Sequence, residues 1–185
     1  IQDYFGDGDA LGMSLHYSVE DVPLGTAGSV KLAEHLLDET FLVISGDALT
    51  DYDLTEIIDY HRARKSIATL TLTHVPEPLE YGVVVTDGDG HIRQFLEKPS
   101  WSEVISDTIN TGIYVLEPEV LQRCPSGQQY DFSQDLFPSL LADGQPMFGY
   151  IADGYWTDVG TINEYARACF DALEGKVQVD LGDPG

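Results

Sequence analysis

Basic residues are scarce in this chain of 185 residues, which contains 9 Lys and Arg against 32 Asp and Glu and carries a formal net charge of −23. A surface of this sign repels phosphate backbones, so we expect no nucleic-acid partner. An acidic protein that binds phosphorylated small molecules must reverse its field locally, with a cation or with a few well-placed Lys and Arg side chains. The acids form no block of like charges, and most of them are interpreted as a solvated surface.

Cysteines and long apolar runs are also few. Cys124 and Cys169 show neither a pairing motif nor metal-ligand spacing, which favours two reduced thiols in a cytoplasmic protein. No run approaches the ~18 apolar residues of a membrane span, so no membrane association is predicted. The chain starts at Ile1 with neither an initiating Met nor a signal-peptide pattern, and we interpret it as the interior of a longer sequence. Its size and its 43% hydrophobic content suit a single domain.

The most informative segment that is present is an apolar run ending on Gly46 and Asp47. Residues 41–45 predict a buried parallel strand that delivers the Asp47 carboxylate at its C-terminal edge, where open α/β sheets place their ligands. A second acid, Asp158, lies among glycines and aromatic residues in the stretch 154–160. Two carboxylates that are far apart in sequence but converge in one crevice would form a hard-oxygen site for a divalent cation such as Mg²⁺.

Hydrophobic periodicity predicts an α/β layered domain around a mixed sheet, because strands and helices alternate before a hairpin-rich segment. Strands are predicted at residues 15–19, 41–45, 67–75, 83–86, 91–96, 111–116 and 147–152, and helices at residues 26–37, 54–64, 132–141 and 161–173. The turn at residues 87–90, with the sequence Asp-Gly-Asp-Gly, marks a hairpin between the fourth and fifth strands.

Six short segments stand out along the chain: PLGTAG at 23–28, GD at 46–47, EYG at 80–82, EKP at 97–99, NTG at 110–112 and WTD at 156–158. Over nearly its whole length the chain closely resembles the sugar-1-phosphate nucleotidyltransferases, in which these segments occur in the same order. The nearest members are the bacterial mannose-1-phosphate guanylyltransferase-like NDP-sugar pyrophosphorylases. The resemblance implies a Rossmann-like, three-layer nucleotidyltransferase fold that is incomplete at its N-terminus. Residues 1–175 would form this domain, and residues 176–185 a tail or the start of a C-terminal domain.

The resemblance also implies roles for individual residues. Asp47 and Asp158 would bind Mg²⁺, and together with Lys98, which would hold the sugar phosphate, they form the predicted catalytic set. The predicted nucleotide-binding residues are Leu24, Gly25, Thr26 and Gly28, and the predicted sugar-binding residues are Tyr81, Gly82, Glu97, Asn110 and Thr111. Small residues at 24–28 would let the backbone approach a planar base, while Glu97 would accept sugar hydroxyls. Asp51 is interpreted as a surface acid rather than a support of the cation site, and Trp156 as a packing residue.

The implied reaction is in-line attack by a sugar-1-phosphate oxygen on the α-phosphate of a nucleoside triphosphate, with release of pyrophosphate. Mannose-1-phosphate with GTP is the first choice of substrates, and glucose-1-phosphate with UTP, dTTP or ATP stays open. A non-catalytic regulatory paralogue that binds a sugar nucleotide is a rival, as is a glycosyltransferase, although Asp51 and Asp53 follow Asp47 too late for its Asp-x-Asp motif. A homo-oligomer is compatible with all of these readings.

The family's opening glycine-rich loop, Gly-x-Gly-Thr-Arg, and a following Lys-Pro pair have no counterpart in this sequence. Relatives use that loop and its basic residues to hold the triphosphate. The corresponding strands would lie between the predicted strands at 15–19 and 41–45, so we expect unpaired backbone along the edge of the latter. Residues 1–185 alone are therefore expected to be inactive and prone to association. Many relatives continue beyond position 175 into a left-handed β-helix.

Overall fold

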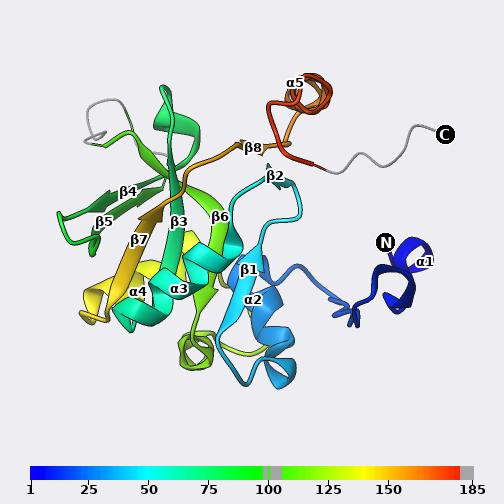
Figure 1. The fold of residues 1–185 in the computed structure, drawn as a ribbon. Helices are drawn as coiled ribbons and strands as arrows, with labels where there is room; N and C mark the ends of the chain where they lie inside the picture. Colours follow the sequence, from blue (N-terminus) through cyan, green and yellow to red (C-terminus); the bar gives the residue numbers. More distant parts are fainter. Residues whose placement is uncertain (98–99, 101–105, 180–185) are drawn as a thin grey trace.

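The structure is a computed structural model that describes residues 1–97, 100 and 106–179. Eight strands are assigned within these residues: β1 (Phe41–Ile44), β2 (Ala48–Thr50), β3 (Ala68–His74), β4 (Gly82–Thr86), β5 (Ile92–Glu97), β6 (Thr108–Leu116), β7 (Met147–Ile151) and β8 (Trp156–Asp158). The large sheet has the order β5–β4–β6–β3–β7, and β1 also pairs with β6 (Figure 1). β3 and β7 are parallel and the other pairs are antiparallel, which confirms the predicted mixed sheet.

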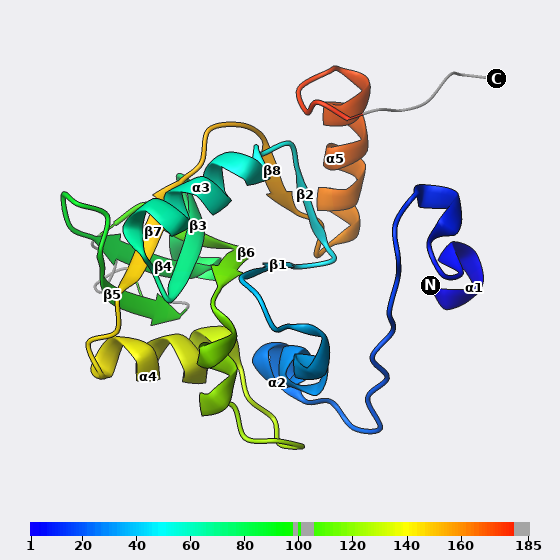
Figure 2. The same cartoon turned by 60° about the horizontal axis from the view of Figure 1, so that its bottom comes forward.

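Helices cover both faces of this sheet (Figure 2). The α-helices are α1 (Gln2–Phe5), α2 (Gly25–Leu32), α3 (Leu54–Arg64), α4 (Phe137–Ala142) and α5 (Ile162–Leu173). Short 3₁₀ turns occupy Asp9–Leu11, Glu34–Leu36, Pro78–Glu80 and Pro118–Arg123, and a π-helical turn at Phe132–Leu136 leads into α4. None of the helices in the described part of the chain combines the length and the apolar character that crossing a membrane requires.

The alternation of side chains along β6 builds a core on each face of the sheet. Tyr114 and Leu116 point to the face covered by α2 and α4, where they belong to one apolar cluster with Phe137. Ile113 and Val115 point to the opposite face and form a second cluster with Ile57 of α3. The central strand therefore fixes both layers of helices, as the predicted three-layer arrangement requires.

β2 and β8 form a separate two-stranded antiparallel sheet that the sequence did not predict. Each strand has three residues, which is too short to give a readable alternation of apolar and polar positions. This small sheet lies beside α5, apart from the large sheet (Figure 2). Its importance is that Asp47 immediately precedes one strand and Asp158 ends the other.

Two predictions about strands were wrong. Residues 15–19 are not a strand, because this segment has no neighbouring strand among the described residues and its Leu15 N–H bonds the carbonyl of Asp7 instead. β1 is a strand, but it is antiparallel to β6 and half-buried rather than buried and parallel. In the described part of the chain β6 is its one partner, so its other edge is open.

Candidate functional site

One edge of β6 is covered by two strands in succession. β1 pairs with residues 113–116 and β4 pairs with Ile109, so residues 110–112 lie between the two partners. A cavity of about 210 Å³ opens at this interruption. Its lining residues are Ser45, Asp47, Ala48, Tyr81, Gly82, Asn110, Thr111, Gly112, Ser133, Trp156 and Asp158. The cavity therefore lies where the edge of β6 changes from one partner strand to the other, and open sheets commonly bind their ligands where neighbouring connections part in this way.

Gly112 allows β1 to approach β6 at the rim of this cavity. The Ser45 N–H donates to the Gly112 carbonyl at 3.0 Å, and the φ of Gly112 is +76°, in the left-handed region that glycine tolerates best. A Cβ at this position would lie 2.6 Å from Ser45 Oγ. The glycine of the Asn-Thr-Gly segment is thus explained by backbone conformation and by this close contact.

Gly112→Ala is expected to destabilise the protein more than Gly127→Ala. Both glycines have positive φ, so each substitution costs about 1–2 kcal/mol of backbone strain. A Cβ at Gly127 meets nothing within 4 Å, whereas one at Gly112 displaces the Ser45 hydroxyl. Urea unfolding of the two variants measures the difference, and equal losses of free energy would contradict the close contact.

The two predicted metal carboxylates meet at one end of the β2–β8 sheet. The register places Ala48 opposite Asp158, and the Val159 N–H donates to the Asp47 carbonyl at 2.9 Å. Both side chains line the cavity. Two acids separated by more than 100 positions are therefore brought together by three residue pairs of β-structure.

The electrostatics of Asp158 differ from those of an ordinary surface acid. Burial raises the pKa of Asp158, and the neighbouring charges of Asp47 and Glu164 raise it further. Close carboxylates that disfavour each other's ionisation are stabilised together when a cation lies between them. The donor set is two carboxylates in a polar cavity, so it fits a hard divalent cation such as Mg²⁺.

Four predicted sugar-binding residues also line this cavity: Tyr81, Gly82, Asn110 and Thr111. The Asn110 side chain is committed within the protein, because its Oδ1 accepts the Gly112 N–H at 3.1 Å and its Nδ2 donates to Tyr114 at 2.9 Å. The Thr111 hydroxyl donates to the Thr71 carbonyl at 2.8 Å. Their prediction as direct sugar ligands is untested, but each has a clear structural role at the cavity wall.

Ser133 is a cavity residue that the sequence analysis did not single out. Its Oγ accepts from Asn110 Nδ2 at a long 3.4 Å, and its backbone N–H donates to Asp131 Oδ1 at 2.8 Å. Sequence reasoning missed it because it lies in the first turn of a helix that reads as amphipathic, far from the motifs in sequence. The nearest signal was the acid two residues earlier, which caps this turn.

Trp156, predicted as a packing residue, does pack but also has a polar contact. Its ring lies edge-to-face with that of Tyr81 at 5.9 Å between centroids. Its Nε1–H donates to the Thr111 carbonyl at 3.1 Å. Trp156 therefore ties β8 to the uncovered stretch of β6 and forms one wall of the cavity.

The predicted nucleotide-binding segment lies outside the lining of this cavity, at the start of α2. Added Cβ atoms would lie 2.7 Å from the Tyr130 carbonyl oxygen at Gly25 and 2.9 Å from the Gln128 carbonyl oxygen at Gly28. The backbone of residues 128–130 thus packs against both glycines, which accounts for the absence of a Cβ at these positions. The nucleotide-binding roles of Leu24, Gly25, Thr26 and Gly28 remain untested.

A chain of hydrogen bonds nevertheless connects α2 to the cavity. Thr26 Oγ1 donates to Asp131 Oδ2 at 2.7 Å, and the other oxygen of Asp131 accepts from the Ser133 backbone. Of the remaining predicted residues, Lys98 lies outside the described residues. The backbone of Glu97 pairs with Gly82, so the last residue of β5 lies beside the first residue of β4.

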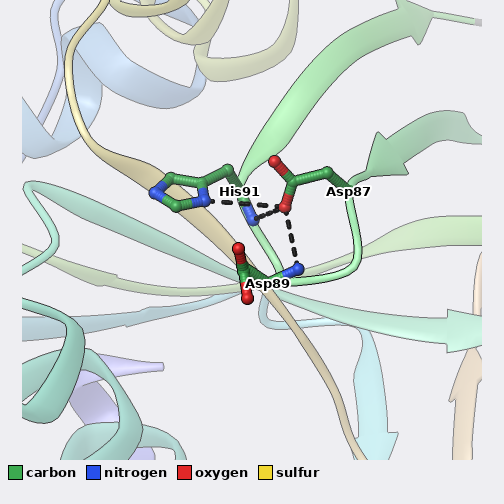
Figure 3. A group of neighbouring side chains, drawn as sticks. All are labelled: Asp87, Asp89 and His91. Atoms are coloured by element: carbon green, nitrogen blue, oxygen red, sulfur yellow. Dashed lines mark hydrogen bonds and ion pairs between the residues drawn. The ribbon is translucent and has the colours of Figure 1, made fainter.

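A second group of potential metal ligands, Asp87, Asp89 and His91, lies in the β4–β5 turn, with ligand atoms within 4.8 Å of one another (Figure 3). Asp87 Oδ1 accepts the backbone N–H groups of Asp89 and His91, both at 3.0 Å. Although burial raises the pKa of Asp87, these bonds and the one from Arg93 bring it down to about 2. The carboxylate is thus committed to the turn, and we assign it no metal.

Comparison with known proteins places the chain in a family. The family model described as nucleotidyl transferase matches residues 1–175. The chain is 41% identical to UTP–glucose-1-phosphate uridylyltransferase of Synechocystis sp., covering 96% of this chain and 50% of that protein. It is 39% identical to mannose-1-phosphate guanylyltransferase of Mycobacterium tuberculosis, covering 92% and 48%. The chain therefore spans about half the length of these curated relatives.

Solved structures agree with this assignment. A Bacillus anthracis protein assigned as a glucose-1-phosphate thymidylyltransferase, in complex with a sucrose, superposes with a TM-score of 0.81 at 26% identity. The match covers 98% of this chain and 73% of that one. HddC from Yersinia pseudotuberculosis, at 24% identity and a TM-score of 0.75, shares the fold. The resemblance seen in the sequence is confirmed: the chain belongs to the nucleotidyl transferase family, among its sugar-1-phosphate nucleotidyltransferases.

Proposed function

We propose that the protein containing this chain joins a hexose-1-phosphate to a nucleoside triphosphate, giving an NDP-sugar and pyrophosphate. The observation that carries the proposal is the cavity at the interruption of β6. It brings Asp47 and Asp158 together with four of the residues predicted to bind the sugar. A cavity lined both by paired acids and by hydroxyl and amide groups suits a ligand that has both a phosphate and several hydroxyls.

Asp47 and Asp158 are the residues that would hold Mg²⁺. A bound Mg²⁺ would supply charge neutralisation at the phosphates, which a chain with a net charge of −23 needs at its site. The protein's own groups would orient the sugar phosphate for in-line attack, with the contacting rings of Trp156 and Tyr81 in the cavity wall. Ser45 and Ser133 present hydroxyls at its rim, and Lys98 is proposed to hold the sugar phosphate. No covalent intermediate with the protein is required.

Mannose-1-phosphate and GTP are the proposed substrates. The Mycobacterium tuberculosis guanylyltransferase supports this pair, as does the catalytic subunit beta from Drosophila pseudoobscura pseudoobscura at 36% identity. A specific observation favours a second candidate, because the Synechocystis uridylyltransferase is 41% identical. Glucose-1-phosphate with UTP is therefore the alternative, and the two differ in both base and sugar.

The test is pyrophosphate release by the product of the complete coding sequence, with Mg²⁺ and each pairing of four triphosphates (GTP, UTP, dTTP, ATP) with mannose- or glucose-1-phosphate. The highest kcat/KM is expected with GTP and mannose-1-phosphate. A maximum with UTP and glucose-1-phosphate would establish the alternative. Binding of a sugar nucleotide without any turnover would contradict both and indicate a regulatory paralogue.

A further inference from the structure

We propose that the Asp51 carboxylate is a positioning residue for the paired acids Asp47 and Asp158. Asp51 would position these two acids by holding β8 in register with β2. This inference rests on the proposed function, since it gives a residue outside the cavity a role in cation binding. It replaces the interpretation of Asp51 as a surface acid.

The β2–β8 sheet is too small to hold its own register. It contains three residue pairs, from Ala48 opposite Asp158 to Thr50 opposite Trp156, and no third strand joins it within residues 1–97 and 106–179. Isolated two-stranded sheets are marginally stable in water. A slip of one residue would move Asp158 to the other face of β8 and away from Asp47. The convergence of the two acids therefore needs support from outside the ladder.

Asp51 supplies that support at the end of the ladder opposite the acids. Its Oδ1 accepts the Tyr155 N–H at 2.7 Å, and its own N–H donates to the Tyr155 carbonyl at 3.3 Å. Its Oδ2 accepts the Gln178 N–H at 2.9 Å, so the segment after α5 joins the same carboxylate. Hydrogen bonds to a charged acceptor are stronger than neutral ones. Residue 155 is thereby fixed directly before β8 begins.

Gly154 shows that this contact is closely fitted. Its φ is +134°, and a Cβ would lie 2.7 Å from Asp51 Oδ1 and 3.1 Å from the Tyr52 ring. The glycine therefore lets the chain turn past the carboxylate just before Tyr155. Thr50 reinforces the same point, because its Oγ1 donates to the Tyr155 carbonyl at 2.9 Å.

The experiment compares Asp51→Ala with Asp53→Ala in the product of the complete coding sequence. Asp53 is a matched control because its carboxylate also accepts two backbone N–H groups, those of Thr55 and Glu56, but it caps α3 instead of tying down β8. Equilibrium binding of Mn²⁺, a hard cation with oxygen ligands like those of Mg²⁺, is measured by electron paramagnetic resonance without substrates. Only the Mn²⁺ binding that is lost in the Asp158→Asn variant is assigned to this site. Mn²⁺ bound by other acids of the surface is thereby left out.

Asp51→Ala is expected to weaken Mn²⁺ binding at this site about 10-fold or more, while Asp53→Ala changes it less than about twofold. Thermal unfolding should show similar losses of stability for both, because each loses a carboxylate that pairs with backbone. Equal Mn²⁺ affinities in the two variants would overturn the positioning role. If Asp51→Ala does not fold, Asp51→Asn decides, since it keeps one acceptor oxygen and should show a smaller loss in the same direction.

The failure of this inference is distinguishable from failure of the proposed function. Pyrophosphate release by the unmodified protein tests the reaction without reference to Asp51. If Asp158→Asn removes no Mn²⁺ binding, the cation site is wrong and the role of Asp51 falls with it. If the site binds Mn²⁺ and Asp51→Ala leaves that binding intact, the site stands and the positioning role is wrong.

Discussion

Asp158→Asn is expected to lower kcat for nucleotidyl transfer by about 10²–10³-fold, the usual effect of removing one electrostatic contact from a transition state. Asparagine keeps the size and a carbonyl oxygen of the side chain but loses the charge that pairs with a divalent cation. Asp158 is held in the β2–β8 sheet through its main chain, opposite Ala48, so the fold should persist. Asp47→Asn should have an effect of similar size.

The measurement is pyrophosphate release at several Mg²⁺ concentrations, with circular dichroism to verify the fold. Asp153→Asn is the charge control, because Asp153 is an exposed acid near β8 that does not line the cavity. Its kcat should stay within about twofold of the unmodified value, which screening of exposed charges allows. Near-normal turnover of Asp158→Asn at moderate Mg²⁺ would show that this carboxylate is not a ligand.

The Asp158 carboxylate also predicts the direction in which the Mg²⁺ requirement changes with pH. Burial, Asp47 and Glu164 raise the pKa of Asp158, and protons compete with a cation for the ionised form. The Mg²⁺ concentration needed for half-maximal rate should therefore fall as pH rises through the ionisation of Asp158.

Phe132→Ala is expected to reduce the free energy of unfolding by about 3–5 kcal/mol. Phe132 is 2% exposed, and its ring lies 5.1 Å from that of Tyr114 and 5.4 Å from that of Phe137, between centroids. Truncation leaves a cavity in the larger core, directly before Ser133 in sequence, and the two aromatic neighbours lose a packing partner.

Urea unfolding measures this loss, and Phe132→Leu is the graded control. Leucine restores most of the buried volume, so its cost should stay below about 1.5 kcal/mol. A loss below that value for Phe132→Ala would mean that the surrounding side chains collapse into the space, contrary to a tightly packed aromatic cluster.

The sequence predicted the layered fold because its periodic signals were strong and local. The helix predicted at residues 54–64 is α3 with the same bounds, and the turn at 87–90 does join two strands. Asp47 and Asp158 were singled out from their glycine framing, and both line the cavity. These features needed only short-range patterns and the resemblance to a family.

What the sequence could not predict depends on contacts between distant segments. The backbone of residues 128–130 packs against Gly25 and Gly28, which lie 100 or more positions away along the chain. Asp51 was read as a surface acid because its partner N–H groups lie 104 and 127 positions away. Ser133 lies at the cavity beside Asn110, a residue 23 positions earlier whose Nδ2 donates to its Oγ. No local pattern encodes such pairings.

The interruption along β6 has a consequence for how the site can diverge. Its width is set by residues 110–112, which lie between the end of β1 and the start of β4. The opposite edge of β6 already carries an irregularity here, because the register with β3 shifts by two residues between the pairs Leu70–Tyr114 and Leu72–Asn110. Insertion or deletion of one residue in this stretch would move every later side chain of β6 to the other face of the sheet and would expose one of the two cores. Ligand preference can therefore change through substitution of the side chains that line the cavity. The length of the segment 110–112 is kept constant by the packing of the rest of the fold.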